Sequence, residues 1–360
     1  MSAGKKSILI VLIAGIGDLV LASKSIRAIR NGLPGADIHV LTSTEAWAIA
    51  KNYTHVNHAW PFPIRELRSK KAYLFEILKL IQRLRKNRFH LVVNLYRIYS
   101  WRGSITMGLL FGLLKSTTKV GHDHKGFGIF LNKKAPANIY KDRHFTDAMM
   151  DIALLAGGVP DDKGIEVFWD ESSENKWRHL ISKHINPQKR RIAINPGADK
   201  PNKRWNPENY ALVANRLMER FDVEIILFGG PGEENIANEL QGRIEKDVTN
   251  LAGQLTLNDL VYIISQCDLL ITNDSGPMHV AAALKTPLVA IFGPETPVHT
   301  RPYTSTDLYR IAFQEVNCRP CQKPNCGRPL CLELITPEEV LEKCVEMLEM
   351  QNMPRKSKER

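Results

Sequence analysis

Four short segments of the 360-residue chain combine residue types that could bind or transfer a charged group. Each follows an apolar run that is typical of a buried parallel strand. The segments are Gly15-Ile-Gly-Asp18, the loop from Asn195 to Trp205, Gly229-Gly-Pro-Gly-Glu233, and Thr272-Asn-Asp-Ser-Gly-Pro-Met-His279. Strand ends of a parallel sheet face one ligand crevice, and helix N-termini there offer free N–H groups to anions.

Asp18 stands at the start of a helical pattern that we expect over 19–30. Its carboxylate either stabilises the helix dipole or points into the crevice as a general base. The segment is not a dinucleotide-binding motif, because Val20 replaces the third glycine, and it has no P-loop lysine.

The next two segments carry groups suited to a nucleotide. Lys203 is either a surface lysine or the cation that neutralises a diphosphate. Glu233 follows three glycines, where it either caps a helix or accepts hydrogen bonds from ribose hydroxyls.

The fourth segment is the most informative of the four. Asp274, Ser275 and Gly276 stand at a strand-to-helix junction, where an N-cap and exposed N–H groups suit a phosphate. His279 lies one turn into that helix, as a structural histidine or as part of the anion site.

Alternating strands and helices must position these segments, and the pattern restarts near residue 190. It predicts an α/β protein with two Rossmann-like domains, separated by a polar segment at 170–189. We expect domains at 1–175 and 186–336, and a last helix within 337–352 that packs back on the first domain. The expected strands are 7–13, 37–41, 91–95, 191–195, 223–228, 269–272 and 287–292, and the tail 354–360 is expected to be loose.

The net charge of +11 belongs entirely to the first half of the chain. Residues 1–180 hold 27 basic and 15 acidic side chains, net +12, whereas 181–360 hold 22 and 23, net −1. This asymmetry indicates an anionic partner for the first half, such as nucleic acid, a membrane surface or a phosphorylated substrate. Residues 65–102 are the most basic stretch, either a solvated helix face or a contact for anionic lipid.

The apolar runs 8–17 and 103–114 are too short to cross a bilayer, so we expect a cytosolic protein without a signal peptide. Of six cysteines, four are close in sequence. Their spacing resembles that of a zinc knuckle, and both a structural zinc site and simple packing remain open for Cys318, Cys321, Cys326 and Cys331.

The order of these motifs resembles that of glycosyltransferase family 9. The motifs are the four segments above, together with Asn-Leu-Ala-Gly-Gln-Leu-Thr-Leu from Asn250 and Phe-Gly-Pro-Glu-Thr-Pro from Phe292. The members of this family are the ADP-heptose:lipopolysaccharide heptosyltransferases, and the similarity to the heptosyltransferase II branch is strongest around His279. The resemblance implies a GT-B fold, with two Rossmann-like domains facing across a cleft, and inverting transfer without a metal ion. No D-x-D triplet stands in a strand-end loop, in agreement.

The resemblance also implies roles for single residues. Asp18 would be the base, and Lys203 would stabilise the departing diphosphate. Glu233 would bind ribose, Leu255 and Thr256 would hold adenine through backbone groups, and the sugar diphosphate would be surrounded by Asp274, Ser275, Gly276 and His279. Candidates for the phosphorylated lipid A–core acceptor are Gly17, Arg97, Arg102 and Arg143, with His122, His124 and Lys125 as further basic candidates.

The resulting hypothesis is transfer of heptose from ADP-L-glycero-D-manno-heptose to the lipopolysaccharide inner core, at the cytoplasmic face of the inner membrane. A GT-B transferase that uses another nucleotide sugar is the enzymatic alternative. A catalytically inactive relative that binds membrane or nucleic acid is the alternative from another class, although no nucleic-acid-binding motif is present.

Overall fold

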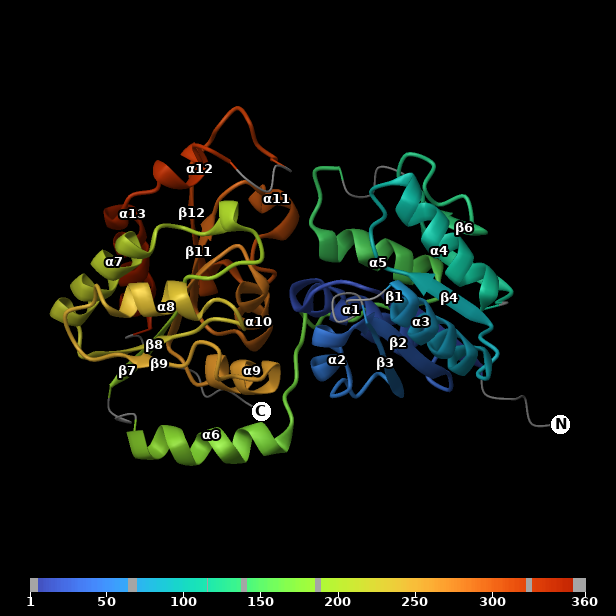
Figure 1. The fold of residues 1–360 in the computed structure, drawn as a ribbon, viewed down its shortest axis with the longest axis horizontal. Helices are drawn as coiled ribbons and strands as arrows, with labels where there is room; N and C mark the ends of the chain where they lie inside the picture. The colour runs from blue at the N-terminus through green and yellow to red at the C-terminus, as the bar shows by residue number, and fades with distance from the viewer. Residues whose placement is uncertain are drawn as a thin grey trace. The chain divides into compact units, whose positions relative to one another are not determined.

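The computed structural model describes residues 6–63, 70–114, 116–136, 141–184, 189–321 and 326–351. The chain divides into two compact units at the bond between Phe168 and Trp169 (Figure 1). Within the described residues, no helix combines the length and the apolar content that crossing a bilayer requires.

The first unit is a six-stranded sheet in which every neighbouring pair is parallel. The strand order is β3-β2-β1-β4-β5-β6. The strands are β1 (Ser7–Leu12), β2 (Asp37–Ser43), β3 (His58–Phe62), β4 (Leu91–Asn94), β5 (Thr118–His122) and β6 (Lys133–Ala135). The central strand β1 is buried from Ile8 onward, as expected for a parallel strand covered on both faces.

Helices cover both faces of this sheet. Leu9 and Val11 of β1 share a core cluster with α3 (Lys70–Arg85) and α4 (Trp101–Leu113). Because successive strand residues point to opposite faces, Ile8 and Ile10 face the other side. On that side α1 (Ile16–Gly32) packs against α5 (Phe145–Leu155) and contacts α2 (Thr44–Ala50).

The second unit repeats this topology, with the strand order β12-β11-β10-β7-β8-β9 and only parallel neighbours. Its strands are β7 (Arg190–Asn195), β8 (Val223–Leu227), β9 (Thr249–Asn250), β10 (Leu269–Asn273), β11 (Leu288–Phe292) and β12 (Tyr309–Phe313). Its helices are α6 (Glu171–His184), α7 (Pro207–Arg220), α8 (Glu234–Gln241), α9 (Leu257–Ser265), α10 (Gly276–Leu284), α11 (Pro297–Thr300), α12 (Leu330–Glu333) and α13 (Pro337–Met350), with 3-10 turns at Pro201–Lys203 and Thr306–Leu308.

In chain order, both sheets have the Rossmann arrangement 3-2-1-4-5-6. The direction in which strands are added reverses between β1 and β4 in the first unit, and between β7 and β10 in the second. Ligands of such sheets bind beyond the carboxyl ends of the strands at this reversal. Each unit therefore has one topologically defined place for a ligand.

Two segments at the edges of the second repeat, the polar segment after Phe168 and the last helix, belong to the second unit. The segment 170–189 contains α6, which belongs to the second unit: Trp169 meets the ring of Tyr262, and Lys176 pairs with Asp259 at 3.1 Å. The last helix, α13, packs on α7 and on β10–β12 of its own unit. Its apolar face is part of the second core, so the packing follows from burial of Val340, Cys344 and Leu348. The predicted tail 354–360 lies outside the described residues.

Candidate functional site

Asn273 connects two loops at the strand reversal of the second unit. Its side chain is fully buried, and its Nδ2 donates to the carbonyls of Pro196 and Gly197 at 2.9 and 3.1 Å. Its Oδ1 accepts the N–H of Trp205 at 3.0 Å. The end of β10 thus fixes both ends of the loop that carries Lys203.

Asn195, the last residue of β7, makes the matching contacts from the other side. Its Nδ2 donates to Thr272 Oγ1 and to Ser275 Oγ, each at 3.3 Å. Ser275 is the N-cap residue of α10, but its hydroxyl meets Asn195 and Thr272 rather than the N–H groups of the first turn. The positive end of α10, which begins at Gly276, is therefore offered to an anion.

Lys203 lies beside that helix end. Its Nζ is 2.6 Å from Asp274 Oδ2 and 3.3 Å from the Asp274 carbonyl oxygen. The carboxylate of Asp274 is 4% exposed, whereas the lysine is 22% exposed. Two of the predicted donor-side residues are thus brought into contact, with the ammonium as the more accessible partner.

Glu233 approaches the same loop from the start of α8. Its carboxylate accepts the N–H of Gly230 at 2.8 Å and lies 3.7 Å from the guanidinium of Arg204. A Cβ atom on Gly197 would come within 2.2 Å of Glu233 Oε2, so any larger residue at position 197 requires the Glu233 carboxylate to move. The sequence placed these two segments in one crevice, and the structure brings them into contact.

Thr256, one of the two residues expected to hold adenine, begins a helix. It is the N-cap of α9 in a capping box with Asp259, and its own N–H donates to Asp259 Oδ2 at 3.0 Å. Its carbonyl accepts the N–H of Leu260. Both backbone groups of Thr256 therefore take part in the start of α9, directly after Leu255. His279 is buried within α10.

In the first unit, Asp18 lies in the first turn of α1, directly after β1. Across the strand reversal, Tyr96 follows β4, in a turn that Asn94 fixes through both its amide atoms. Burial, and after it the carboxylate of Asp18, raise the pKa of the Tyr96 phenol. These two side chains are therefore electrostatic neighbours at the topological ligand position.

The predicted acceptor-side residues are only partly brought together. Arg97 packs over the rings of Tyr99 and Phe145, with its guanidinium carbon 4.8 and 5.6 Å from their centroids. Buried His122, at the end of β5, has its pKa lowered to about 4 by burial and by the positive charge of Arg97. Gly17 lies beside Asp18 in α1, Arg102 is exposed on α4, and Arg143 pairs with Asp151 at 2.6 Å.

Four residues near the carboxyl ends of the central strands were assigned no role from the sequence, namely Tyr96, Asn195, Arg204 and Asn273. The asparagines end strands β7 and β10, and a buried polar residue at a strand end is a readable signal. Tyr96 carries no such signal, because a single tyrosine after a strand has many structural explanations.

The four clustered cysteines line one small cavity, together with Asn202 and Arg319. Within the described part of the chain, however, no three of these thiols lie within 4.8 Å of one another. Tetrahedral zinc needs closer convergence of its ligands, so the arrangement does not fit the zinc knuckle that the spacing suggested.

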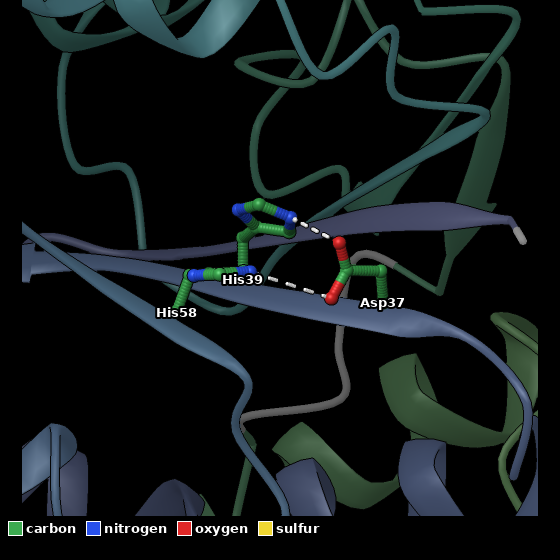
Figure 2. Close-up of side chains that lie close together, drawn as sticks. All are labelled: Asp37, His39 and His58. Atoms are coloured by element: carbon green, nitrogen blue, oxygen red, sulfur yellow. Dashed lines mark hydrogen bonds and ion pairs between the residues drawn. The ribbon is translucent and has the colours of Figure 1, made fainter.

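A different cluster, Asp37, His39 and His58, does meet this distance criterion (Figure 2). Asp37 accepts from His39 Nε2 at 3.2 Å and lies 3.6 Å from His58 Nε2. Trp60 Nε1 is 3.0 Å from His39 Nδ1, and an indole N–H can only donate. The ring proton of His39 therefore lies on Nε2, which makes that atom a donor to Asp37 and not a metal ligand.

Comparisons with known proteins agree with this arrangement of strands and loops. A family model described as glycosyltransferase family 9 (heptosyltransferase) matches residues 77–330. Lipooligosaccharide heptosyltransferase 2 of Campylobacter jejuni is 35% identical over 169 residues, which are 44% of this chain and 51% of the relative. That match thus spans about half the length of the relative. Lipopolysaccharide core heptosyltransferase OpsX of Haemophilus influenzae is 25% identical over 343 residues, 91% of either chain.

Among solved structures, Escherichia coli ADP-heptose lipopolysaccharide heptosyltransferase II superposes with a TM-score of 0.76. The identity is 23%, and the superposition covers 96% of this chain and 99% of that one. This likeness shows the fold, a GT-B-type pair of Rossmann-like domains. Because the family model spans the larger part of both units, the chain belongs to glycosyltransferase family 9, the heptosyltransferases.

Proposed function

We propose that the protein transfers heptose from ADP-L-glycero-D-manno-heptose to the phosphorylated inner core of lipopolysaccharide. The observation that carries this proposal is the contact of Lys203 with Asp274 beside the N-terminus of α10. A cation beside the positive end of a helix at the strand reversal suits the diphosphate of a nucleotide sugar. Family membership supports heptose as the sugar, and the names of the relatives support a lipopolysaccharide acceptor.

In the proposed reaction, Asp18 takes the proton of the acceptor hydroxyl while its oxygen bonds to the anomeric carbon of the heptose. The bond from that carbon to the diphosphate oxygen breaks, the electron pair leaves with ADP, and the configuration inverts. Lys203 and the first turn of α10 stabilise the charge that develops on the leaving group. A fixed cation fills the role of a metal ion, so the proposed transfer needs no metal.

We assign the remaining roles to the donor side in the second unit and to the acceptor side in the first unit. Glu233, oriented by Gly230 and Arg204, binds the ribose hydroxyls, and Leu255 contacts adenine. Ser275, Gly276 and His279 surround the sugar diphosphate. On the acceptor side we assign Gly17, Arg97, Arg102 and Arg143 to the phosphorylated core, with Arg97 best placed next to Tyr96. We place the reaction at the cytoplasmic face of the inner membrane.

The test is incubation with ADP-heptose and heptose-deficient lipopolysaccharide, followed by mass spectrometry of the acceptor. A gain of one heptose is expected with the wild-type protein. Asp18→Asn should lower kcat by about a thousandfold, since general base catalysis contributes ~10²–10⁴, while its affinity for ADP stays unchanged. Asp162→Asn, an exposed carboxylate of the same unit, is the matched control.

Other outcomes would redirect the proposal. Product formed only from another nucleotide sugar would keep the transferase and replace the donor. Absence of product with every nucleotide sugar tested would favour an inactive binding protein. Wild-type turnover by Asp18→Asn would remove Asp18 as the base.

A further inference from the structure

The exposed apolar side chains of the first unit are concentrated on one surface. Eight of the sixteen large apolar side chains that are exposed in the described part of the chain lie between residues 75 and 129. Six of them define what we term the α3–α4 surface: Phe75 and Leu78 of α3, and Trp101, Ile105, Leu109 and Leu113 of α4. Helices α3 and α4 contact each other and pack on the same face of the sheet.

The α4 part of this surface is a continuous stripe. Its four residues recur at steps of four, and Ile105 and Leu109 are 58% and 64% exposed. At 100° per residue the stripe is centred opposite the buried residues Met107 and Phe111, and it runs for about 18 Å along the helix. Helix α4 is thus apolar on both faces, although only one face meets the core. Apolar side chains arranged in this way mark an interaction site.

The charges around the stripe identify the partner. Residues 75–114 hold seven basic side chains and one acidic side chain. Five of the basic residues are exposed on or directly after the two helices: Lys79, Arg83 and Arg85 on α3, Lys86 directly after α3, and Arg102 on α4. An apolar stripe flanked by lysine and arginine is the pattern of a helix that lies in the headgroup region of an anionic membrane.

We propose that the α3–α4 surface binds an anionic lipid bilayer, with the stripe of α4 inserted among the acyl chains near the headgroups. The basic side chains of α3 then contact lipid phosphates while their alkyl stems cover the apolar boundary. The 13 residues of α4 are too few to span a bilayer, so the helix lies along the surface. The inference rests on the proposed function only in that a lipid-anchored acceptor gives this contact a purpose.

Binding is measured by flotation with vesicles of phosphatidylcholine, with and without phosphatidylglycerol, in the absence of donor and acceptor. The wild-type protein should float with the anionic vesicles, and less so as salt is raised. The variant I105S/L109S should bind at least tenfold more weakly, since burial of each large aliphatic side chain contributes more than a factor of ten. The variant R83S/K86S should lose about thirtyfold on anionic vesicles, at ~1 kcal/mol per basic residue, and nothing on neutral ones.

The matched control is L212S/L334S, which replaces two leucines of the second unit that are 49% and 50% exposed, and it should bind as the wild type. Thermal unfolding of each variant in buffer checks that the fold is kept. Vesicles with brominated acyl chains should quench the wild-type fluorescence more than that of Trp101→Phe. Heptosyl transfer to a delipidated acceptor is assayed separately, so a failure of lipid binding is distinguishable from a failure of the proposed activity.

Two results would overturn the inference. One is unchanged flotation of I105S/L109S. The other is a wild-type dimer in lipid-free sedimentation that becomes a monomer in I105S/L109S, which would assign the surface to a second copy of the chain.

Discussion

The strand-end edges of the two units hold polar side chains in different ways. In the second unit, Asn195, Asn273 and Glu233 are tied to backbone groups of neighbouring loops, and Lys203 is tied to Asp274. In the first unit, burial and a nearby charge shift the pKa values of His122 and Tyr96 away from their ordinary values.

The difference indicates two kinds of site. A network of hydrogen bonds fixes the shape of a cavity before the ligand arrives, which suits a ligand of constant structure such as a nucleotide. Burial next to a charge instead sets which protonation state a side chain has, which suits proton transfer. The predictions below test this difference between the two units.

The largest expected effect is on Lys203. Lys203→Met should lower kcat/KM by about a hundredfold, because removing one group that stabilises a developing charge costs ~3 kcal/mol. Calorimetry should also show weaker ADP binding, unlike in Asp18→Asn. Since the variant leaves the buried Asp274 carboxylate without its ammonium, K203M/D274N is the companion variant. It should regain thermal stability but not ADP affinity. Wild-type ADP affinity in both variants would contradict a diphosphate role.

The second prediction concerns His122 and the dependence of stability on pH. Its pKa is about 4 in the folded protein, below the ordinary value of 6.5, because burial and Arg97 disfavour the charged ring. The unfolded chain therefore binds the extra proton between these values, and stability falls as pH falls through this window. From pH 7 to pH 5 this amounts to about 2 kcal/mol.

His122→Gln should remove about 2 kcal/mol from the loss of unfolding free energy between pH 7 and pH 5, whatever its effect at pH 7. Urea unfolding at both pH values measures this difference. His122→Asn, a second replacement that cannot bind the proton, is the companion variant and should show the same reduced slope. If the unfolding free energy of His122→Gln depends on pH as that of the wild type does, burial does not set the protonation state of His122.

The smallest effect is expected at Gly197. Gly197→Ala places a methyl group against the Glu233 carboxylate, which must rotate away from Gly230. ADP affinity should fall about tenfold, the ~1.4 kcal/mol typical of one lost hydrogen bond to a charged group. Glu233→Gln in the same background tests the cause. If the methyl group acts through Glu233, the double variant should be no weaker than the more affected single variant.

Sequence patterns predicted the central strands of both sheets and missed several edge strands. Strands β1, β7 and β10 each contain a run of buried apolar residues, because both faces of these strands are covered. Strand β3 contains Pro61 and exposed His58, and β9 has only two residues, so neither has an apolar pattern to detect. Because the central strands have a detectable apolar pattern and the edge strands do not, two Rossmann-like domains could be predicted although the full set of strands could not.

The candidate site could be predicted where topology alone brings residues together. Lys203 and Asp274 follow neighbouring strands at the reversal, so their proximity is a consequence of strand order. The closeness of Glu233 to Gly197, in contrast, depends on the path of two loops, which no local pattern encodes. At Thr256, the Thr-x-x-Asp pattern of a capping box was present, but the family resemblance directed attention to adenine.

The ion pair between Lys203 and Asp274 has a consequence for turnover. The ammonium has a resting partner in the structure, so its side chain is already ordered when the nucleotide sugar arrives. In the proposed reaction, ADP would share that ammonium after transfer with a carboxylate 2.6 Å away. Asp274 would then compete with the product for the cation, speed the departure of ADP and free the site for the next donor.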